Sequence, residues 1–554
     1  MLLYQKIVQE LIKKSYKNRN DFELAKKKLC GKYKVKPVMN SVLINAYRKL
    51  LQDKKIKRNL NLEKLTIARA TRTISGVTPV TVLTKPYQCP GQCIYCPHEI
   101  NMPVSYLSNE PAAQRAKGLN FNPYQQVQYR IKALETNGHV VDKIELLVLG
   151  GSWNAYPRSY QNNFIARCFQ AANDYPRNKA KPPTRGLALE LKRNEKAKYR
   201  IIGETLETRP DLLDQKEIIA MREQGCTRIQ LGVQHTDDQI LKKVKRGHGQ
   251  KEIIKATKLC KQVGIKVDYH LMPDLPFSTP AKDFKMFQKV FSDSNYQPDQ
   301  IKIYPCVVTK EAQPLYKLFK EKKYSPYTKK QLLDLLVKIK TKTIPYYVRI
   351  NRLIRDIPSE SIVAGNKITN LRQSVQLELG KKNLQCKCIR CREIKNQSLG
   401  SARSASSSRP RGRDREFKLS DAKLFIEKYP ASDGIEYFIS YENKERDKLY
   451  AFLRLRFNDT SENNFIPELN NASIVREIHA YGKLIAHGKK KSDTAELSSA
   501  QHMGFGKKLM IEAEKISQKN GYSKIAVISG IGVREYYRKL GYKLEGTYMV
   551  KKLI

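Results

Sequence analysis

The sequence predicts an α/β protein: a partial TIM-like (βα)6 barrel, then a second α/β domain, with a helical segment in front of both. Three observations lead to this prediction. Between residues 79 and 307, short runs of β-forming residues alternate with helical stretches, as in a parallel sheet covered by helices. Further along the chain, a separate group of expected strands flanks one long helical pattern. The first 60 residues are helical in pattern and rich in lysine.

The chain of 554 residues is long enough for about two to four domains with full hydrophobic cores. Composition shifts and breaker residues suggest where the parts begin and end. We expect a basic helical segment at 1–70, the partial barrel at 71–345, a Cys-rich metal-binding joint at 346–396, a Ser/Arg-rich linker at 397–416 and the second domain at 417–554.

The charge balance is strongly basic, with 104 Lys and Arg against 53 Asp and Glu and a net charge of +51. Such a charge indicates a polyanionic partner, and nucleic acid is the first candidate. The N-terminal lysines suit either a nucleic-acid arm or a solvated helical face. There is no signal-peptide pattern and no apolar run of membrane-spanning length, so we expect a cytoplasmic chain without a membrane partner.

The six expected barrel strands cover residues 79–84, 144–149, 200–205, 227–231, 266–271 and 301–307. In such barrels the chemistry lies at the carboxyl ends of the strands. Polar or glycine-rich segments follow the strands there, and we expect cofactor-binding residues among them: Gly150, Gly151, Glu207, Gln234 and His270. Each of these residues also has a purely structural interpretation. The glycines suit a tight turn, Glu207 suits an ion pair with Arg209, and His270 suits a satisfied core histidine.

The first of these segments contains Cys89, Cys93 and Cys96, spaced C-x3-C-x2-C. In an intracellular protein, thiols this dense indicate metal ligands. Three thiolates leave one corner of a four-iron cluster without a protein ligand, as a catalytic metal site requires. The alternative is a structural zinc knuckle with His98 as its fourth ligand.

A second thiol cluster, Cys386, Cys388 and Cys391, follows an Arg-rich segment around Arg349 to Arg355 that we expect to be helical. Three thiols in six residues suit tetrahedral zinc with a fourth ligand from elsewhere in the fold. Incidental thiols are the alternative.

The second domain has expected strands at 435–441, 448–457, 473–481 and 524–529, with a helix that ends near residue 519. Glycines at the start of this helix, together with its free N–H groups and positive dipole end, predict a pyrophosphate cradle. The cradle residues are Gln501, His502, Met503, Gly504, Phe505, Gly506 and Lys507, and the pair Tyr536-Tyr537 follows on a later helix.

These motifs resemble two known families. The loop Cys89-Pro-Gly-Gln-Cys93-Ile-Tyr-Cys96 is the signature of radical S-adenosylmethionine (SAM) enzymes, which implies a 4Fe-4S cluster with SAM on its open iron and Gly150-Gly151 beside the SAM amino group. The second domain resembles the GNAT acetyltransferases. That resemblance implies acetyl-CoA in the cradle and a tyrosine near the CoA sulfur, with Tyr537 the best match and Tyr536 the alternative.

The combination resembles the family of tRNA wobble-uridine modifying enzymes to which the Elongator catalytic subunit belongs. Matching stretches include Glu204-Thr-Leu-Glu-Thr-Arg-Pro-Asp211, His270-Leu-Met-Pro-Asp-Leu-Pro276 and Ile474-Val-Arg-Glu477. The chain departs from many members at His98-Glu99, where they carry Gly-Gly. The resemblance implies a tRNA anticodon stem-loop as substrate, and either accessory Elongator-type subunits or a homodimer.

The implied reaction is a radical transfer. The adenosyl radical takes hydrogen from the acetyl methyl group, the carbon radical adds to C5 of the wobble uridine, and loss of CoA by hydrolysis leaves 5-carboxymethyluridine. A radical cofactor suits this target because ordinary acetyl transfer makes bonds to N or O. The rival hypothesis is a protein lysine acetyltransferase with structural metal sites and Glu477 as general base. A non-catalytic tRNA-binding scaffold is a third reading.

Overall fold

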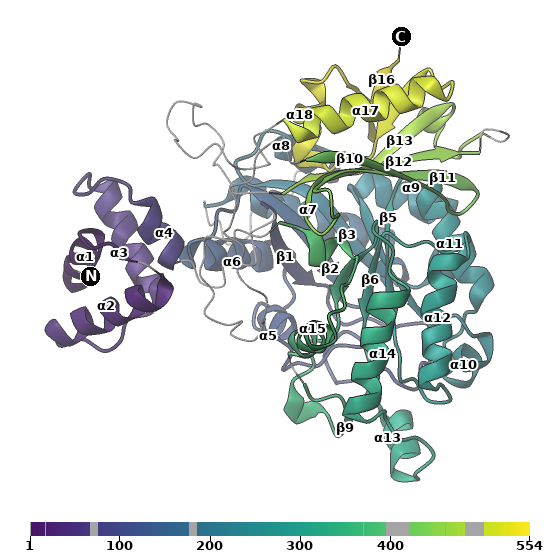
Figure 1. Ribbon diagram of the computed structural model, residues 1–554, viewed down its shortest axis with the longest axis horizontal. Helices are drawn as coiled ribbons and strands as arrows, with labels where there is room; N and C mark the ends of the chain where they lie inside the picture. Colours follow the sequence, from purple (N-terminus) through teal and green to yellow (C-terminus); the bar gives the residue numbers. More distant parts are fainter. Residues whose placement is uncertain are drawn as a thin grey trace.

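The computed structural model describes residues 2–16, 18–66, 76–176, 186–368, 370–394, 422–459, 461, 463–481 and 504–553 (Figure 1). The predicted Ser/Arg-rich linker at 397–416 lies outside the described residues. The same is true of three expected cradle residues, Gln501, His502 and Met503.

The N-terminal segment forms a helical bundle with a core of its own, at one end of the molecule next to α6 (Figure 1). Its apolar stripes include Ile7, Leu11, Leu43 and Leu50, all of which are buried between the helices. This confirms the helical prediction. The helices are α1 (Leu2–Ile12), α2 (Arg19–Lys32), α3 (Asn40–Gln52) and α4 (Leu60–Thr66).

The central part of the chain is a half-barrel of seven parallel strands in the order β1-β2-β3-β4-β5-β6-β8. All six predicted strands are present. The strands are β1 (Thr78–Leu83), β2 (Lys143–Leu149), β3 (Arg200–Thr208), β4 (Arg228–Gln234), β5 (Lys266–Leu271), β6 (Gln300–Ile303) and β8 (Arg349–Arg352).

The seventh strand corrects one expectation, because the Arg-rich segment that begins at Arg349 was expected to be helical. Residues 349–352 instead extend the sheet by pairing in parallel with β6. Only Ile350 in this strand is fully buried, so its sequence carries no clear apolar alternation. Its conformation is determined by backbone pairing with β6, which local sequence does not reveal.

Helices cover the outer face of the half-barrel (Figure 1), and α14 packs against α12 and α15. A short two-stranded sheet joins β7 (Val307–Val308) to β9 (Ala364–Gly365). The helices are α5 (Pro111–Lys117), α6 (Pro123–Thr136), α7 (Arg158–Asp174), α8 (Leu187–Asn194), α9 (Gln215–Gln224), α10 (Asp238–Lys243), α11 (Gln250–Gln262), α12 (Pro280–Ser292), α13 (Gln313–Lys320), α14 (Lys329–Lys342), α15 (Leu371–Lys381) and α16 (Ile389–Arg392).

The C-terminal domain is a seven-stranded mixed sheet in the order β10-β11-β12-β13-β14-β16-β15. Its helix α17 (Phe505–Lys519) lies between β13 and β14, which pair in parallel, and α18 (Arg534–Arg538) follows β14. The four predicted strands are present, and three more were not predicted: β10, β15 and β16. The strands are β10 (Lys423–Pro430), β11 (Gly434–Glu442), β12 (Leu449–Asn458), β13 (Ala472–Ala480), β14 (Lys524–Val527), β15 (Lys543–Glu545) and β16 (Tyr548–Lys552).

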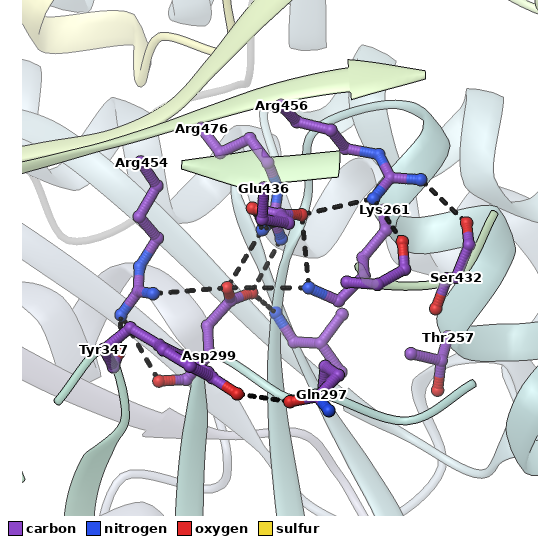
Figure 2. Close-up of polar contacts among 12 residues, drawn as sticks. Thr257, Lys261, Gln297, Asp299, Tyr347, Ser432, Glu436, Arg454, Arg456 and Arg476 are labelled. Atoms are coloured by element: carbon purple, nitrogen blue, oxygen red, sulfur yellow. Dashed lines mark hydrogen bonds and ion pairs between the residues drawn. The ribbon is translucent and has the colours of Figure 1, made fainter. Parts of the chain in front are cut away.

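The two sheets are joined by a buried group of charged side chains, here called the charge cluster (Figure 2). Asp299, which precedes β6, accepts hydrogen bonds of 2.9 and 2.6 Å from both Nη atoms of Arg476 on β13. Arg476 also donates to Glu436 on β11 at 2.8 Å. The cluster consists of Lys261, Asp299, Glu436, Arg454, Arg456 and Arg476, each at most 1 % exposed.

Two glycines bring the second domain against the half-barrel backbone. A Cβ at Gly530 would lie 2.0 Å from the carbonyl oxygen of Ile202, and one at Gly532 would lie 2.6 Å from Cβ of Arg200. Only glycine permits this approach, because any side chain would overlap β3. The largest hydrophobic core accordingly includes residues of both sheets, such as Ile201 of the half-barrel and Ile474 of the second sheet.

No helix among the described residues is both long and apolar enough to cross a membrane.

Candidate active site

A single cavity of about 890 Å³ lies inside the half-barrel and reaches the second domain. We call it the central cavity. Inward-facing side chains of the barrel strands line it, and residues of β12, β13 and α18 line its other end, including Tyr536 and Tyr537. The barrel interior is polar where barrels usually carry branched apolar residues. The polar lining includes Glu145, Glu207, Arg228, Gln230, Lys266, His270, Gln300, Lys302 and Asn351.

The loop from Cys89 to Cys96, here called the thiol loop, follows β1 at the carboxyl edge of the sheet. Cys93 is buried, and its Sγ atom lies 3.3 Å from Arg246 Nη1 and 3.9 Å from Arg209 Nη1. Burial raises the pKa of Cys93, but Arg246 and Arg209 outweigh it and the pKa is lowered overall. The two guanidinium groups therefore favour the thiolate, which is the form that binds iron.

The geometry does not support a zinc knuckle at this loop. The side chain of His98 is exposed. Within the described part of the chain, the only group of three or more potential ligands whose atoms all lie within 4.8 Å of one another is Cys386, Cys388 and Cys391. The wider spacing of the thiol loop suits a multi-iron cluster better than a single ion.

Gly150 and Gly151 follow β2 and lie next to the thiol loop, with φ angles of +130° and +99°. A Cβ at Gly150 would lie 2.0 Å from Thr84 Oγ1, so packing against β1 requires glycine there. The same turn carries Ser152, whose Oγ lies 3.8 Å from Cys89 Sγ. The turn is therefore structural at Gly150, while a Cβ at Gly151 would meet only the carbonyl oxygen of Val104, at 3.5 Å.

Five side chains form a continuous polar chain along the central cavity. Tyr106 donates to Glu207 Oε2 at 2.6 Å, and Glu207 Oε1 lies 3.5 Å from His270 Nδ1. His270 Nε2 and Lys302 Nζ both contact Gln230 Oε1, at 3.1 and 2.5 Å. The three strands β4, β5 and β6 thus bring distant residues to one place, and His270 is the register neighbour of Lys302.

Burial dominates the electrostatics of this polar chain. It lowers the pKa of Lys302 to about 8, although Asp268 and Glu207 act in the opposite direction. Burial also lowers the pKa of His270, with Lys302 adding to the effect, and raises the pKa of Glu207. Near neutral pH these side chains therefore include a charged Lys302 ammonium close to a neutral His270 imidazole.

Glu207 and Arg209 do not form the ion pair that was one interpretation of the sequence. Arg209 instead pairs with Asp211 at 2.9 Å and donates to the carbonyl oxygen of Arg246 at 2.8 Å. Gln234 lines the central cavity in a left-handed backbone conformation with φ of +69°, and its buried Oε1 atom has no hydrogen-bond partner among the described residues. It is therefore available to a ligand donor.

The second thiol cluster is compact and buried. Its three sulfur atoms lie within 4.8 Å of one another, close to the spacing of about 3.8 Å that tetrahedral Zn–S bonds of about 2.3 Å produce. Lys340 on α14 lies next to it, with Nζ 3.3 Å from Cys386 Sγ and 3.6 Å from Cys391 Sγ. The donor set fits zinc, and Lys340 offsets part of the thiolate charge.

At the far end of the central cavity, helix α17 begins after Gly504, which has φ of +76°. A Cβ at Gly506 would lie 2.9 Å from the hydroxyl of Tyr536, so that hydroxyl lies against the first turn of α17. Tyr536 is 40 % exposed, whereas Tyr537 is 5 % exposed and packs in the core of the second sheet. Both line the central cavity, and the hydroxyl of Tyr536 lies beside Gly506 of the expected cradle.

Glu477 on β13 is held between two cations. Its carboxylate lies 3.2 Å from Lys266 Nζ and 2.9 Å from Arg454 Nε. Burial raises the pKa of Glu477, but Lys266 and Arg454 outweigh it and lower the pKa to about 2. A carboxylate held this strongly in its charged form is a weak base near neutral pH.

A parallel half-barrel with three thiols at its carboxyl edge defines a radical SAM enzyme, here with a second α/β domain attached. The family model of the Radical SAM superfamily matches residues 84–286, and the Radical_SAM C-terminal domain model matches residues 298–381. Membership of this superfamily implies a 4Fe-4S cluster and SAM, and the thiol loop and central cavity fit both.

Individual relatives identify the family within this superfamily. The chain is 42% identical over 495 residues to the tRNA uridine(34) acetyltransferase of Methanocaldococcus infernus, covering 88% of this chain and 87% of that protein. It is 33% identical to human Elongator complex protein 3 over 572 residues, covering 100% and 97%. A solved structure of M. infernus Elp3 that lacks residues 1–46 matches with a TM-score of 0.70 and 39% identity, covering 87% of this chain and all of that one. The chain therefore belongs to the Elp3 family of tRNA uridine(34) acetyltransferases.

Sequence reasoning missed four residues of the site: Gln230, Arg246, Lys302 and Lys340. Gln230 and Lys302 stand within predicted strands, and a polar residue inside a buried strand is a signal that could have been followed. Arg246 and Lys340 offer no such signal, because their thiol partners are 153 and 46 residues away in the chain.

Proposed function

We propose that this protein carboxymethylates C5 of the wobble uridine of tRNA, with acetyl-CoA as carbon donor and SAM-derived radical chemistry. The observation that supports this most directly is the central cavity, which reaches from the barrel strands to the tyrosine pair of the second domain. One continuous space can therefore accommodate a group from the second domain and a base from the substrate.

Cys89, Cys93 and Cys96 would hold the four-iron cluster, which supplies the electron for reductive cleavage of SAM. Arg246 and Arg209 stabilise the thiolate of Cys93 there. The charge cluster and the glycine contacts with β3 join the second domain to the barrel, so both domains contribute to the wall of the cavity.

The first turn of α17 would hold the pyrophosphate of acetyl-CoA. Backbone N–H groups at Phe505, Gly506 and Lys507 lie at the positive end of the helix dipole, where an anion is favoured. Tyr536 is the tyrosine that geometry favours for contact with the thioester end, because its hydroxyl lies beside Gly506. Tyr537 would then support it from the core.

The tRNA would bind over the basic rim of the cavity. The lining includes several arginines that suit backbone phosphates. The net charge of +51 supports the same partner. A wobble base stands in a single-stranded loop and can leave its stack to enter a pocket. Accessory subunits or a homodimer remain predictions. The lining arginines that we propose for this contact are Arg115, Arg130, Arg349, Arg352, Arg355 and Arg390.

The rival function, a protein lysine acetyltransferase, finds no support in the geometry. Its expected base, Glu477, is held as a carboxylate by Lys266 and Arg454. We also propose zinc as the ion of the second thiol cluster, where it would brace α16 against α14.

Anaerobic reconstitution tests the function. The protein, loaded with iron and sulfide, is given a reductant, SAM, acetyl-CoA and unmodified tRNA, and the nucleosides are analysed by mass spectrometry. We expect a carboxymethyl mass on uridine that disappears in Cys93→Ala and persists in Cys168→Ala, a buried thiol outside both thiol groups. Acetylated lysine peptides with intact SAM would instead establish the rival function.

A further inference from the structure

We propose that Lys302 and Gln230 bind the C4 carbonyl oxygen of the substrate base and thereby select uracil over cytosine. This inference rests on the proposed function, since it takes a pyrimidine of tRNA as the ligand of the central cavity. It assigns a specificity role to two residues in the middle of the barrel.

The first observation is the polar interior of the half-barrel. Gln230 and Lys302 face inward and line the cavity, yet they are only 1 % and 7 % exposed. Burying an amide and an ammonium is costly unless polar partners replace water. A cavity that carries such groups on its wall is built for a ligand with complementary polar atoms.

The second observation is that both side chains have donors left over. Lys302 Nζ donates to Gln230 Oε1 at 2.5 Å, and no carboxylate of the described residues lies within 4.0 Å of that nitrogen. An ammonium has three donors, so two remain. The oxygen of Gln230 is already used by Lys302 and His270, and no hydrogen bond within the described structure uses its Nε2 group.

The orientation of these donors is fixed by their neighbours. His270 contacts Gln230 Oε1 at 3.1 Å, and Glu207 lies 3.5 Å from the other ring nitrogen of His270. This arrangement keeps the amide oxygen of Gln230 toward Lys302 and His270 and leaves its NH₂ group unused within the described structure. Lys302 and Gln230 therefore offer adjacent hydrogen-bond donors on the cavity wall, which suit an acceptor atom of a ligand.

Uracil and cytosine differ at C4, where uracil carries a carbonyl oxygen and cytosine an amino group, and at the protonation of N3. A carbonyl oxygen accepts from Lys302 and Gln230, whereas an amino group would place donors against a cation and an amide NH₂. The adjacent ring atom is C5, the position modified in the proposed reaction. Donors at O4 would thus both select the base and position its reactive carbon.

The test is a binding measurement that needs no turnover. Two unmodified transcripts of one tRNA, which differ only in uridine or cytidine at the wobble position, are titrated against the full-length protein at one fixed salt concentration. We expect wild type to prefer the uridine transcript by about 5- to 150-fold, the range for a good base-specific contact. Lys302→Gln should abolish most of this preference, because a glutamine can offer either its carbonyl or its NH₂ group.

Lys330→Gln is the matched control, since Lys330 stands on the exposed face of α14 with a side chain 90 % exposed. It should keep the full preference. Lys302→Met is the second variant, of similar size and without donors, and should keep only the part of the preference that Gln230 supplies. Thermal melting checks that each variant is folded.

Three results would overturn the inference. Equal binding of both transcripts by wild type would refute it while leaving the proposed function intact. Full preference for uridine in folded Lys302→Gln or Lys302→Met would also refute it. If wild type bound neither transcript, the inference and the proposed function would both fail.

Discussion

Asp299→Asn is the substitution that tests the joint between the two sheets. Asp299 is fully buried and accepts two hydrogen bonds from Arg476, at 2.9 and 2.6 Å (Figure 2). Asparagine has nearly the same size and shape, so the change removes one negative charge and leaves packing almost unaltered. Its effect therefore measures the electrostatic contribution of this carboxylate.

The magnitude follows from the charges in the cluster. Four cations, Lys261, Arg454, Arg456 and Arg476, surround the carboxylates of Asp299 and Glu436. After the substitution, Glu436 would be the only carboxylate left against Lys261, Arg456 and Arg476, while Arg454 would keep Glu477. Removing one partner from a buried ionic group costs about 3–5 kcal/mol, because the remaining charges stay desolvated without compensation.

The assay is thermal unfolding of wild type and variant, together with limited proteolysis to detect release of the second domain. A loss of about 3–5 kcal/mol in the free energy of unfolding should lower the melting temperature by roughly 6–20 °C for a domain of about 150–250 residues. Asp334→Asn is the matched control, because Asp334 pairs with Lys330 at 2.9 Å on an exposed helix surface. Exposed pairs contribute about 0.2–1 kcal/mol, so the control should change little.

If Asp299→Asn melts within experimental error of Asp334→Asn and shows the same proteolysis pattern, the carboxylate of Asp299 does not stabilise the joint. Such a result would mean that hydrophobic contacts alone hold the domains together and that the charge cluster is energetically neutral.

Two further predictions concern the pH dependence of the melting temperature and the binding of zinc. Burial raises the pKa of Glu436, but Arg476 and other cations lower it to about 2 from 4.5. Because the folded-state pKa is depressed, its stabilisation is complete above about pH 4.5 and is lost as the pH falls toward 2. Melting temperature should drop across that window, and a flat profile there would contradict the assignment. In the second thiol cluster, Cys388→Ser should lower the zinc bound per chain, while Cys168→Ser should not. Elemental analysis decides this, and unchanged zinc in Cys388→Ser would rule out the zinc proposal.

Much of the fold could be predicted because its determinants are local. Runs of β-branched and aliphatic residues alternate with helical periodicity, and this alternation located all six predicted barrel strands. The spacing of Cys89, Cys93 and Cys96 indicated a metal-binding loop, since three thiols in eight residues must come together whatever the rest of the chain does.

The strands that were missed lack such local signals. Arg349–Arg352 has one fully buried residue and becomes a strand by pairing with β6. The edge strand β10 alternates exposed and half-buried residues and pairs only with β11. In both cases the partner strand determines the conformation.

Local sequence patterns are enough to predict the parts of this protein: a half-barrel, a thiol loop at its rim, and a second α/β domain with a glycine-rich helix start. How these parts meet depends on contacts that form only in the folded chain. The register of three parallel strands brings Gln230, His270 and Lys302 together in one cavity, and docking of the second sheet buries Arg476 against Asp299. These contacts join residues far apart in the chain, and their energies depend on burial, which exists only after the chain has folded.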